Sequence, residues 1–176
     1  MNVTLKNGSE LIIRRAEKQD AQQIIDYLKI VRGESDNLLA SPNDPLPTLE
    51  QEERIIENFN NAKCSELLVG FIDNQVAGIG CFSENYRERI LHQGSIAMSV
   101  LKKYWGVGVG TALMNAIIEF AKNTGVIEII HLQVKADNEC GINLYKKIGF
   151  EEIGRFPKFF KINGEYYDNI YMNLYL

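Results

Sequence analysis

Residues 100–113 read Val100-Leu101-Lys102-Lys103-Tyr104-Trp105-Gly106-Val107-Gly108-Val109-Gly110-Thr111-Ala112-Leu113. Three glycines alternate with other residues between a preceding apolar run, typical of a strand, and a following segment whose apolar residues have helical spacing. The order predicts a strand, a glycine loop and a helix. Glycine permits positive φ and close approach of a ligand to the backbone, and the next helix offers unpaired N–H groups. Such a loop suits an anion, above all a phosphate.

Three phosphate-binding patterns compete for this loop. The dinucleotide pattern G-x-G-x-x-G fails because its third glycine position, counted from Gly106, is Thr111, and the Walker pattern fails because no Gly-Lys-Ser/Thr follows. The remaining pattern, Q/R-x-x-G-x-G/A, matches at Gly108 and Gly110 and has Trp105 in place of Gln or Arg. This loop resembles the pyrophosphate loop of the GNAT-type N-acetyltransferases, whose backbone amides hold the diphosphate of acetyl-CoA. A glycine-rich turn without a ligand is the alternative.

A second segment, residues 138–150, resembles another element of the same family, N-x-x-A-x-x-L-Y-x-K-x-G-F. The matching residues are Asn138, Leu144, Tyr145, Lys147, Gly149 and Phe150. Gly141 replaces the alanine, which could loosen a helix by about 1 kcal/mol. One helix and one buried strand separate the two motifs, in the order that the family has. The sequence is therefore identified as resembling a GNAT-type N-acetyltransferase over roughly its C-terminal half.

Both the order of elements and the resemblance indicate an α/β fold, α+β by some schemes. We expect a single mixed, mostly antiparallel central sheet flanked by helices, as in GNAT-like acyl-CoA N-acyltransferases, and one domain over residues 1–176. The resemblance implies acetyl-CoA as co-substrate, with its arm bound along the strand before the loop. The cofactor-binding residues it implies are Met98, Val100, Trp105, Gly106, Val107, Gly108, Val109, Gly110, Thr111, Asn138, Asn143, Tyr145 and Lys147. Asn138 is expected to cap its helix as well.

Tyr145 is the predicted general acid. An amine that attacks a thioester passes through an oxyanion and expels a thiolate, and the amides of Met98 and Val100 are the expected oxyanion donors. A free thiol has a pKa of about 8.5 and a tyrosine one of about 10, so Tyr145 could protonate that thiolate at small cost. The resemblance implies the same role. The alternative is an amphipathic core tyrosine with its hydroxyl at the rim.

The general base is not evident. Many family members carry a glutamate on the strand before the glycine loop, whereas residues 92–98 contain no carboxylate. His92 has a suitable unperturbed pKa, and Glu84 and Glu88 precede it, so each is a candidate that could act through water. A structural histidine at a strand start is the alternative for His92. The missing glutamate supports a second function, a non-catalytic acyl-CoA-binding or regulatory module.

Periodicity and turn residues predict the remaining elements. Strands are expected at residues 3–5, 11–16, 66–72, 76–82, 90–101, 126–134, 150–154, 159–162 and 171–174, with hairpin turns at Asn7-Gly8, Asp73-Asn74 and Asn163-Gly164. Residues 126–134 have the composition of a central strand covered on both faces. Helices are expected from Asp20 to Gly33, from the Thr48/Gln51 capping box to Phe59, from Val109 to Gly125, and over residues 138–148.

Composition restricts the partners. A net charge of −4 argues against nucleic acid and against an anionic membrane surface. Three scattered cysteines and two histidines lack metal-ligand spacing, so no metal is expected. The N-terminus lacks the apolar run of a signal peptide, which favours the cytoplasm. The tyrosine-rich C-terminal strands could pair across a homodimer.

The acceptor is expected to be a small-molecule amine or an amine of a peptide or protein. Acidic residues of the loop at residues 34–47, together with residues after the last hairpin turn, could attract a cationic amine. These residues are Glu34, Asp36, Asp44, Tyr166, Tyr167 and Asp168. An acidic loop that is merely solvated is the alternative.

Overall fold

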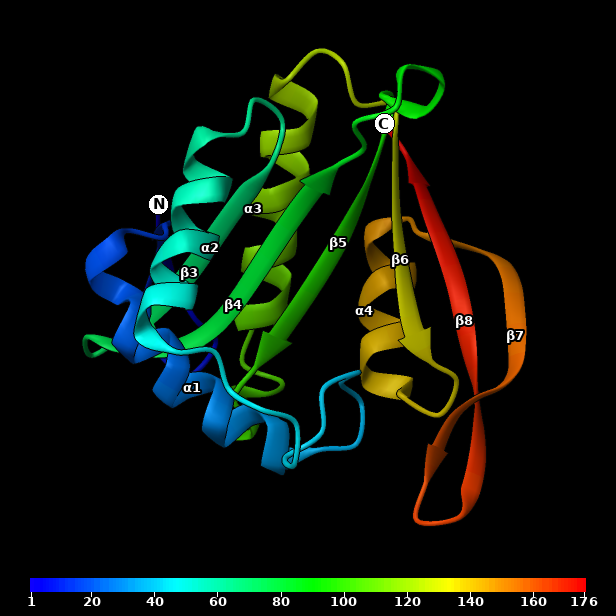
Figure 1. Ribbon diagram of the computed structural model, residues 1–176, viewed down its shortest axis with the longest axis horizontal. Helices are drawn as coiled ribbons and strands as arrows, with labels where there is room; N and C mark the ends of the chain where they lie inside the picture. Colours follow the sequence, from blue (N-terminus) through cyan, green and yellow to red (C-terminus); the bar gives the residue numbers. More distant parts are fainter.

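The computed structural model describes residues 1–176 (Figure 1). The strands are β1 (Asn2–Thr4), β2 (Glu10–Arg15), β3 (Glu66–Ile72), β4 (Gln75–Glu84), β5 (Gln93–Val100), β6 (Ile129–Lys135), β7 (Glu151–Ile162) and β8 (Glu165–Tyr175). The helices are α1 (Ala21–Glu34), α2 (Leu49–Asn61), α3 (Val109–Asn123) and α4 (Glu139–Ile148). Short 3-10 turns lie at Lys18–Asp20, Glu88–Ile90 and Lys102–Tyr104.

All eight strands form one sheet with the order β1-β2-β3-β4-β5-β6-β8-β7. Every neighbouring pair is antiparallel except β5 and β6, which are parallel. The connection between these two strands contains α3, as a parallel crossover requires. The predicted mixed, mostly antiparallel sheet flanked by helices is confirmed.

The helices cover the two faces of the sheet unequally. On one face, α3 and α4 pack over a core of 22 buried residues that includes Ile117, Ile130 and Met172. On the other face, α1 and α2 pack over β3 and β4 around 11 buried residues, among them Tyr27 and Ile56. Figure 1 shows α1 and α2 on the half of the sheet away from β6, β7 and β8. The second face of those three strands is left without a helix.

This arrangement corrects one prediction about β6. Its residues Ile130, Leu132 and Val134 are buried, whereas Gln133 on the opposite face is exposed and His131 is only half-buried. The composition of residues 126–134 therefore wrongly predicts cover on both faces. The physical reason is that α1 and α2 contact β3 and β4 and do not extend to β6.

The predicted hairpin turns are confirmed. Asp73 and Asn74 have φ of 49° and 61° between β3 and β4, and Asn163 and Gly164 have φ of 51° and 89° between β7 and β8. Two successive residues with positive φ match the right-handed twist of the flanking strands. The turn containing Gly8 joins β1 to β2.

Helix boundaries follow the sequence at α2 and depart from it at α1. The Thr48 hydroxyl accepts from the Gln51 amide, and the Gln51 side chain accepts from the Thr48 amide, which confirms the capping box. Asp20 precedes α1 but does not cap it, because its carboxylate binds Arg14 instead. The helix also continues through Gly33 to Glu34.

The C-terminal strands are longer than predicted. The strands predicted at residues 150–154 and 159–162 form one strand, β7, which begins at Glu151 and has register shifts near Gly154 and between Phe156 and Phe160. An edge strand tolerates such irregularities and also tolerates Pro157, because its outer side needs no ladder partner. None of the helices is both long and apolar enough to cross a membrane.

Candidate active site

The site begins where β5 and β6 separate. Their parallel pairing covers only three positions, from Gln93 opposite Ile129 to Ser95 opposite His131. Beyond that point β5 stays paired with β4 as far as Val100, and β6 stays paired with β8 as far as Lys135. Figure 1 shows the two strands diverging, with α4 behind the gap. One edge of β5 therefore presents backbone groups that no strand uses.

A cleft of about 680 Å³ occupies this gap. It is lined by the end of α1 and the loop after it, by the end of β5, by the glycine loop with the start of α3, and by α4. The predicted cofactor-binding residues that line it are Met98, Val100, Trp105, Gly106, Gly108, Gly110, Thr111, Asn138, Asn143, Tyr145 and Lys147. The fold thus brings both sequence motifs to one place.

The glycine loop ends in the first turn of α3. Gly106 and Gly108 have φ of 76° and 114°, which a residue with a side chain adopts only with strain. A Cβ built on Gly108 would meet nothing closer than Leu5 Cδ2 at 3.7 Å, so the space beside it is open. The first intrahelical bond runs from the Ala112 amide to the Gly108 carbonyl, and the three preceding amides of the helix are free for a ligand.

Two predicted residues contribute only backbone here. The side chain of Val109 is fully buried, and that of Val107 packs against the core under α3. The Val107 carbonyl also accepts a hydrogen bond from the Lys6 amide at 3.1 Å. That bond holds the turn between β1 and β2 beside the glycine loop, and Lys6 of this turn lines the cleft. No local sequence motif marked Lys6 for this position.

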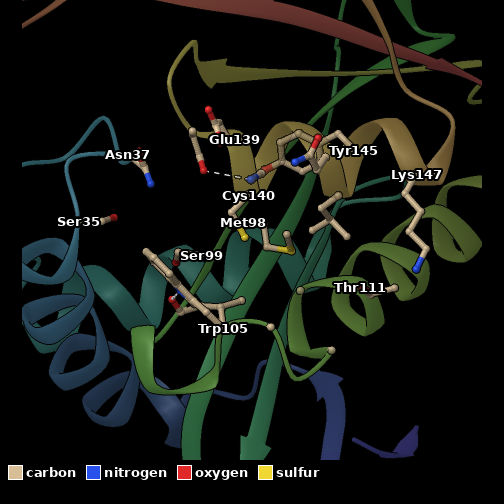
Figure 2. Close-up of a pocket in the computed structure, with 18 of the residues that line it drawn as sticks. Ser35, Asn37, Met98, Ser99, Trp105, Thr111, Glu139, Cys140, Tyr145 and Lys147 are labelled. Atoms are coloured by element: carbon tan, nitrogen blue, oxygen red, sulfur yellow. Dashed lines mark hydrogen bonds between the residues drawn. The ribbon is translucent and has the colours of Figure 1, made fainter. Parts of the chain in front are cut away.

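The charges of the cleft are separated. Thr111 and Lys147 lie at one end in Figure 2, and Ser35, Asn37 and Glu139 lie at the other. Asp137 is the second carboxylate of the lining. Its Oδ2 lies 2.6 Å from Nζ of the buried Lys135. The cleft is therefore basic near the glycine loop and carries carboxylates near the N-terminus of α4.

Tyr145 lies on α4, and its ring packs 6.0 Å from that of Phe150. Figure 2 shows it above Met98, beside the gap between the strands. Burial raises the pKa of Tyr145 to about 12, and the nearby Cys140 thiol adds to the rise. The hydroxyl consequently keeps its proton at neutral pH and can donate a hydrogen bond.

Asn138 caps α4 as predicted. Its Oδ1 accepts from the Gly141 amide at 3.0 Å. A Cβ on residue 141 would lie only 2.8 Å from Asn138 Nδ2, so the side chain of Asn138 fills the space that an alanine would need. Glycine at this position lets the cap fold closely over the first turn.

The structure does not bring the predicted base candidates to the cleft. Glu84 is paired with Gly94, and the carbonyl of His92 accepts from the amides of Glu128 and Ile129, at the end where β5 and β6 are still joined. His92 is six residues from Met98, roughly 20 Å along an extended strand. Glu88 belongs to the turn before His92. None of the three lines the cleft.

The acidic loop residues do not line the cleft either. A carboxylate oxygen of Glu34 accepts from the Lys102 amide at 2.6 Å, and one of Asp44 accepts from the Ser41 amide at 2.7 Å. Asp168 accepts from Arg155 and from the Lys158 amide. These carboxylates are engaged in hydrogen bonds within the chain. The carboxylates that do line the cleft are Asp137 and Glu139, at the start of α4, and sequence reasoning missed both.

Ser99 is a further lining residue that the sequence did not indicate. Its Oγ lies 2.8 Å from the hydroxyl oxygen of Tyr27 on α1. These residues are 72 positions apart, and neither belongs to a recognisable motif. Only the packing of α1 on the sheet reveals the pair.

Comparison with known proteins agrees with this geometry. The model of the Acetyltransferase (GNAT) family matches residues 35–150. The chain is 31% identical over 165 residues to L-amino acid N-acetyltransferase AaaT of Escherichia coli, covering 93% of this chain and 97% of that protein. It is 32% identical over 151 residues to an N-alpha-acetyltransferase of Sulfurisphaera tokodaii, covering 84% of each.

Among solved structures, a GNAT-family acetyltransferase from Streptococcus pneumoniae superimposes with a TM-score of 0.91 at 28% identity. The superposition covers 94% of this chain and 99% of that one. The chain belongs to the Acetyltransferase (GNAT) family, and it is an N-acetyltransferase.

Proposed function

We propose that this protein transfers the acetyl group of acetyl-CoA to a primary amine by direct attack, without a covalent enzyme intermediate. The observation that carries the proposal is the gap between β5 and β6, which has the glycine loop at one end and Tyr145 beside it. A long anionic carrier needs an anchor for its phosphates, and its thioester needs a proton donor near the sulfur. The two sequence motifs supply these groups from the glycine loop and from α4, which both flank the same eight-stranded sheet, and this supports residues 1–176 acting as a single domain.

Two segments of acetyl-CoA, the diphosphate and the pantetheine arm, would each contact a different part of the site. Its diphosphate would accept hydrogen bonds from the free amides of Val109, Gly110 and Thr111, with Lys6 and Lys147 adding positive charge. Its pantetheine arm would lie along the unpaired edge of β5 like an added strand. The thioester would then lie near Met98, whose backbone amide is a suitable donor to the oxyanion.

The reaction requires transfer of the acetyl group to the amine and two proton transfers, one to the departing thiolate and one from the attacking amine. The amine lone pair forms the new N–C bond, and the carbonyl π electrons move to oxygen. The carbonyl then reforms while the C–S bond breaks, and the thiolate takes a proton from Tyr145. The excess amine proton would pass, through water, to Asp137 or Glu139, the carboxylates that line the cleft.

The raised pKa of Tyr145 does not exclude its role as acid. Desolvation raises the pKa of the tyrosine, and it would raise that of a thiol in the same cleft by the same physical cause. The difference between donor and leaving group therefore stays smaller than the shift of Tyr145 alone indicates. Tyr145 would regain its proton from water after CoA departs.

The acceptor that we propose is the α-amine of an amino acid or of a peptide. The support is that two relatives are named for L-amino acid and N-alpha acetylation. The end of the cleft beside Ser35, Asn37 and Leu38 is the side from which such an amine would enter.

A cytoplasmic location fits the use of acetyl-CoA. A homodimer through β7, the exposed edge strand, stays a prediction that light scattering would test.

Thiol release from acetyl-CoA in the presence of amino acids, short peptides, polyamines and aminoglycosides tests this proposal. Turnover with one amine class, with mass spectrometric detection of the N-acetylated product, is the expected result. Tight acetyl-CoA binding without thiol release in any pool would overturn it.

A further inference from the structure

At the end of β5, the side chain of Ser99 lies on the opposite face of the sheet from those of its two neighbours. Its neighbours Met98 and Val100 pack toward the core under α3 and α4, where the cofactor would lie. The side chain of Ser99 points the other way, because its Oγ meets Tyr27 of α1. Ser99 nevertheless lines the cleft, together with Val31 and Ser35 of the α1 end. Its hydroxyl is thus at the junction of the cofactor side and the proposed acceptor side.

The direction of the hydrogen bond follows from the burial of Tyr27. This tyrosine is 2% exposed, and burial raises the pKa of its hydroxyl, so it keeps its proton. The hydroxyl hydrogen then has Ser99 Oγ, 2.8 Å away, as its acceptor, and a buried donor without an acceptor would cost roughly 1–3 kcal/mol.

With the bond in this direction, the Ser99 hydroxyl keeps one lone pair and its hydrogen available for other hydrogen bonds. A serine oxygen has two lone pairs and one hydrogen, and Tyr27 uses a single lone pair. The second lone pair and the hydrogen remain for a ligand in the cleft. The bond to Tyr27 also fixes the side-chain rotamer, so that Oγ is held in place before a substrate binds.

We propose that Ser99 is an acceptor-binding residue whose Oγ accepts an N–H of the attacking amine, and that Tyr27 is a positioning residue that acts through it. This inference rests on the proposed function. The nitrogen must direct its lone pair at the thioester carbon, so its N–H groups point elsewhere and need acceptors. Ser99 lies one residue from Met98, whose amide would hold the oxyanion. No proton of Ser99 or Tyr27 is consumed in the reaction.

A structural role for Ser99, as the partner of a buried tyrosine, predicts different behaviour. Ser99→Ala leaves the Tyr27 hydroxyl unpaired and therefore destabilises the protein in either case. The double variant Tyr27→Phe/Ser99→Ala removes both groups and should restore most of the stability. If Ser99 is only structural, the double variant regains wild-type kinetics. If it binds the amine, stability returns and the kinetic loss stays.

The experiment measures kcat and KM for the best amine, acetyl-CoA affinity by calorimetry, and stability by urea unfolding. We expect Ser99→Ala and the double variant to lose about three- to tenfold in kcat/KM for the amine, while acetyl-CoA affinity changes less than about twofold. Tyr27→Phe should lose less, because Ser99 keeps its hydroxyl. Ser99→Thr should retain activity. Ser95→Ala is the matched control on the same strand and face, outside the cleft lining.

The outcomes separate the two proposals. Failure of the wild type to release thiol from acetyl-CoA with any of the amines overturns the proposed function and the role of Ser99 with it. Turnover by the wild type and equal turnover by the double variant overturns the role of Ser99 alone. An equal loss of acetyl-CoA affinity and amine kcat/KM would also overturn it, since Ser99 would then bind the cofactor.

Discussion

The indole Nε1–H of Trp105 donates a 2.7 Å hydrogen bond to the carbonyl oxygen of Val100. Val100 is the last residue of β5, on the edge that β6 has left. The family pattern has Gln or Arg where Trp105 stands. In this protein the indole therefore occupies a backbone acceptor that an added strand, such as the cofactor's arm, would use.

We predict that acetyl-CoA displaces this bond. Trp105 is the only tryptophan, so its fluorescence reports the event directly. Trp105→Arg should bind acetyl-CoA as well as the wild type or better, because the bond no longer has to break and a positive charge is added near the diphosphate. Calorimetric titration measures the affinity.

Trp105→Phe is the control for this substitution, since it keeps an aromatic ring and removes the N–H. A large affinity loss in Trp105→Arg would show that the indole itself packs against the cofactor. An unchanged emission spectrum of the wild type at saturating acetyl-CoA would contradict displacement.

Gly108→Ala should weaken acetyl-CoA binding at least about tenfold. The φ of 114° makes any side chain strained, so some folding stability is lost too, about 1 kcal/mol. The matched control is Gly125→Ala, since Gly125 also has positive φ, 67°, and open space around it but lies at the other end of α3. Both variants should lose similar stability by urea unfolding, and only Gly108→Ala should lose affinity. Equal effects on affinity would argue against a dedicated phosphate loop.

Local patterns in the sequence were sufficient for much of this fold. The turn at Asn163-Gly164, the capping box at Thr48 and the glycine loop at Gly108 each depend on backbone conformations that neighbouring residues specify. Such features can be predicted because the physical cause lies within a few residues. The two motifs also identify the helix that carries Tyr145 and the loop opposite to it.

Features that depend on tertiary packing were not predicted. The sequence places His92 near the start of the strand before the glycine loop, and His92 does directly precede β5, but only the separation of β5 from β6 shows which end of that strand lines the cleft. The Ser99–Tyr27 contact joins β5 to α1 across 72 residues, and no local pattern specifies it. Asp137 precedes the Asn138 motif directly, which is a signal that could have been used.

Neutralising the carboxylates of the cleft should identify the proton acceptor. We expect either Glu139→Gln or Asp137→Asn to lower kcat at least about tenfold, within the range of general-base contributions. Asp137→Asn should also lower stability, because Lys135 is 5% exposed and would lose its ion-pair partner. Urea unfolding separates that effect from catalysis, and Glu151→Gln, on β7, is the control. Full activity in both cleft variants would contradict their role.

The Arg14–Asp20 ion pair makes stability dependent on pH. Burial alone would raise the pKa of Asp20, but hydrogen bonds from Arg14 and from the Glu17 amide outweigh it and hold that pKa below its usual value. The contribution is therefore present above the unfolded pKa of about 3.9 and is lost as pH falls through the lower folded value. Asp20→Asn should cost about 1–3 kcal/mol at pH 7, and the cost should shrink in acid. Urea unfolding at pH 7 and pH 3 measures both; a cost independent of pH would contradict the account.

Tyr145→Phe is the sharpest test of the mechanism, because it keeps the ring that packs on Phe150 and deletes only the hydroxyl. General-acid contributions are about 10²–10⁴ in rate, and water can partly substitute. We expect kcat to fall at least about tenfold while acetyl-CoA affinity changes less than about threefold, as for an interaction made mainly in the transition state. The exposed Tyr86, changed to Phe, is the control.

The pH profile adds a second criterion. A pKa of about 12 keeps Tyr145 protonated between pH 6 and 9, so its ionisation should produce no alkaline decline of kcat in that window. The Tyr145→Phe variant should accordingly show a profile of the same shape, displaced downward. Pre-steady-state thiol release establishes that chemistry, not product release, limits the rate. Under that condition, unchanged turnover would refute the acid role, and an affinity loss equal to the rate loss would make Tyr145 a cofactor-binding residue.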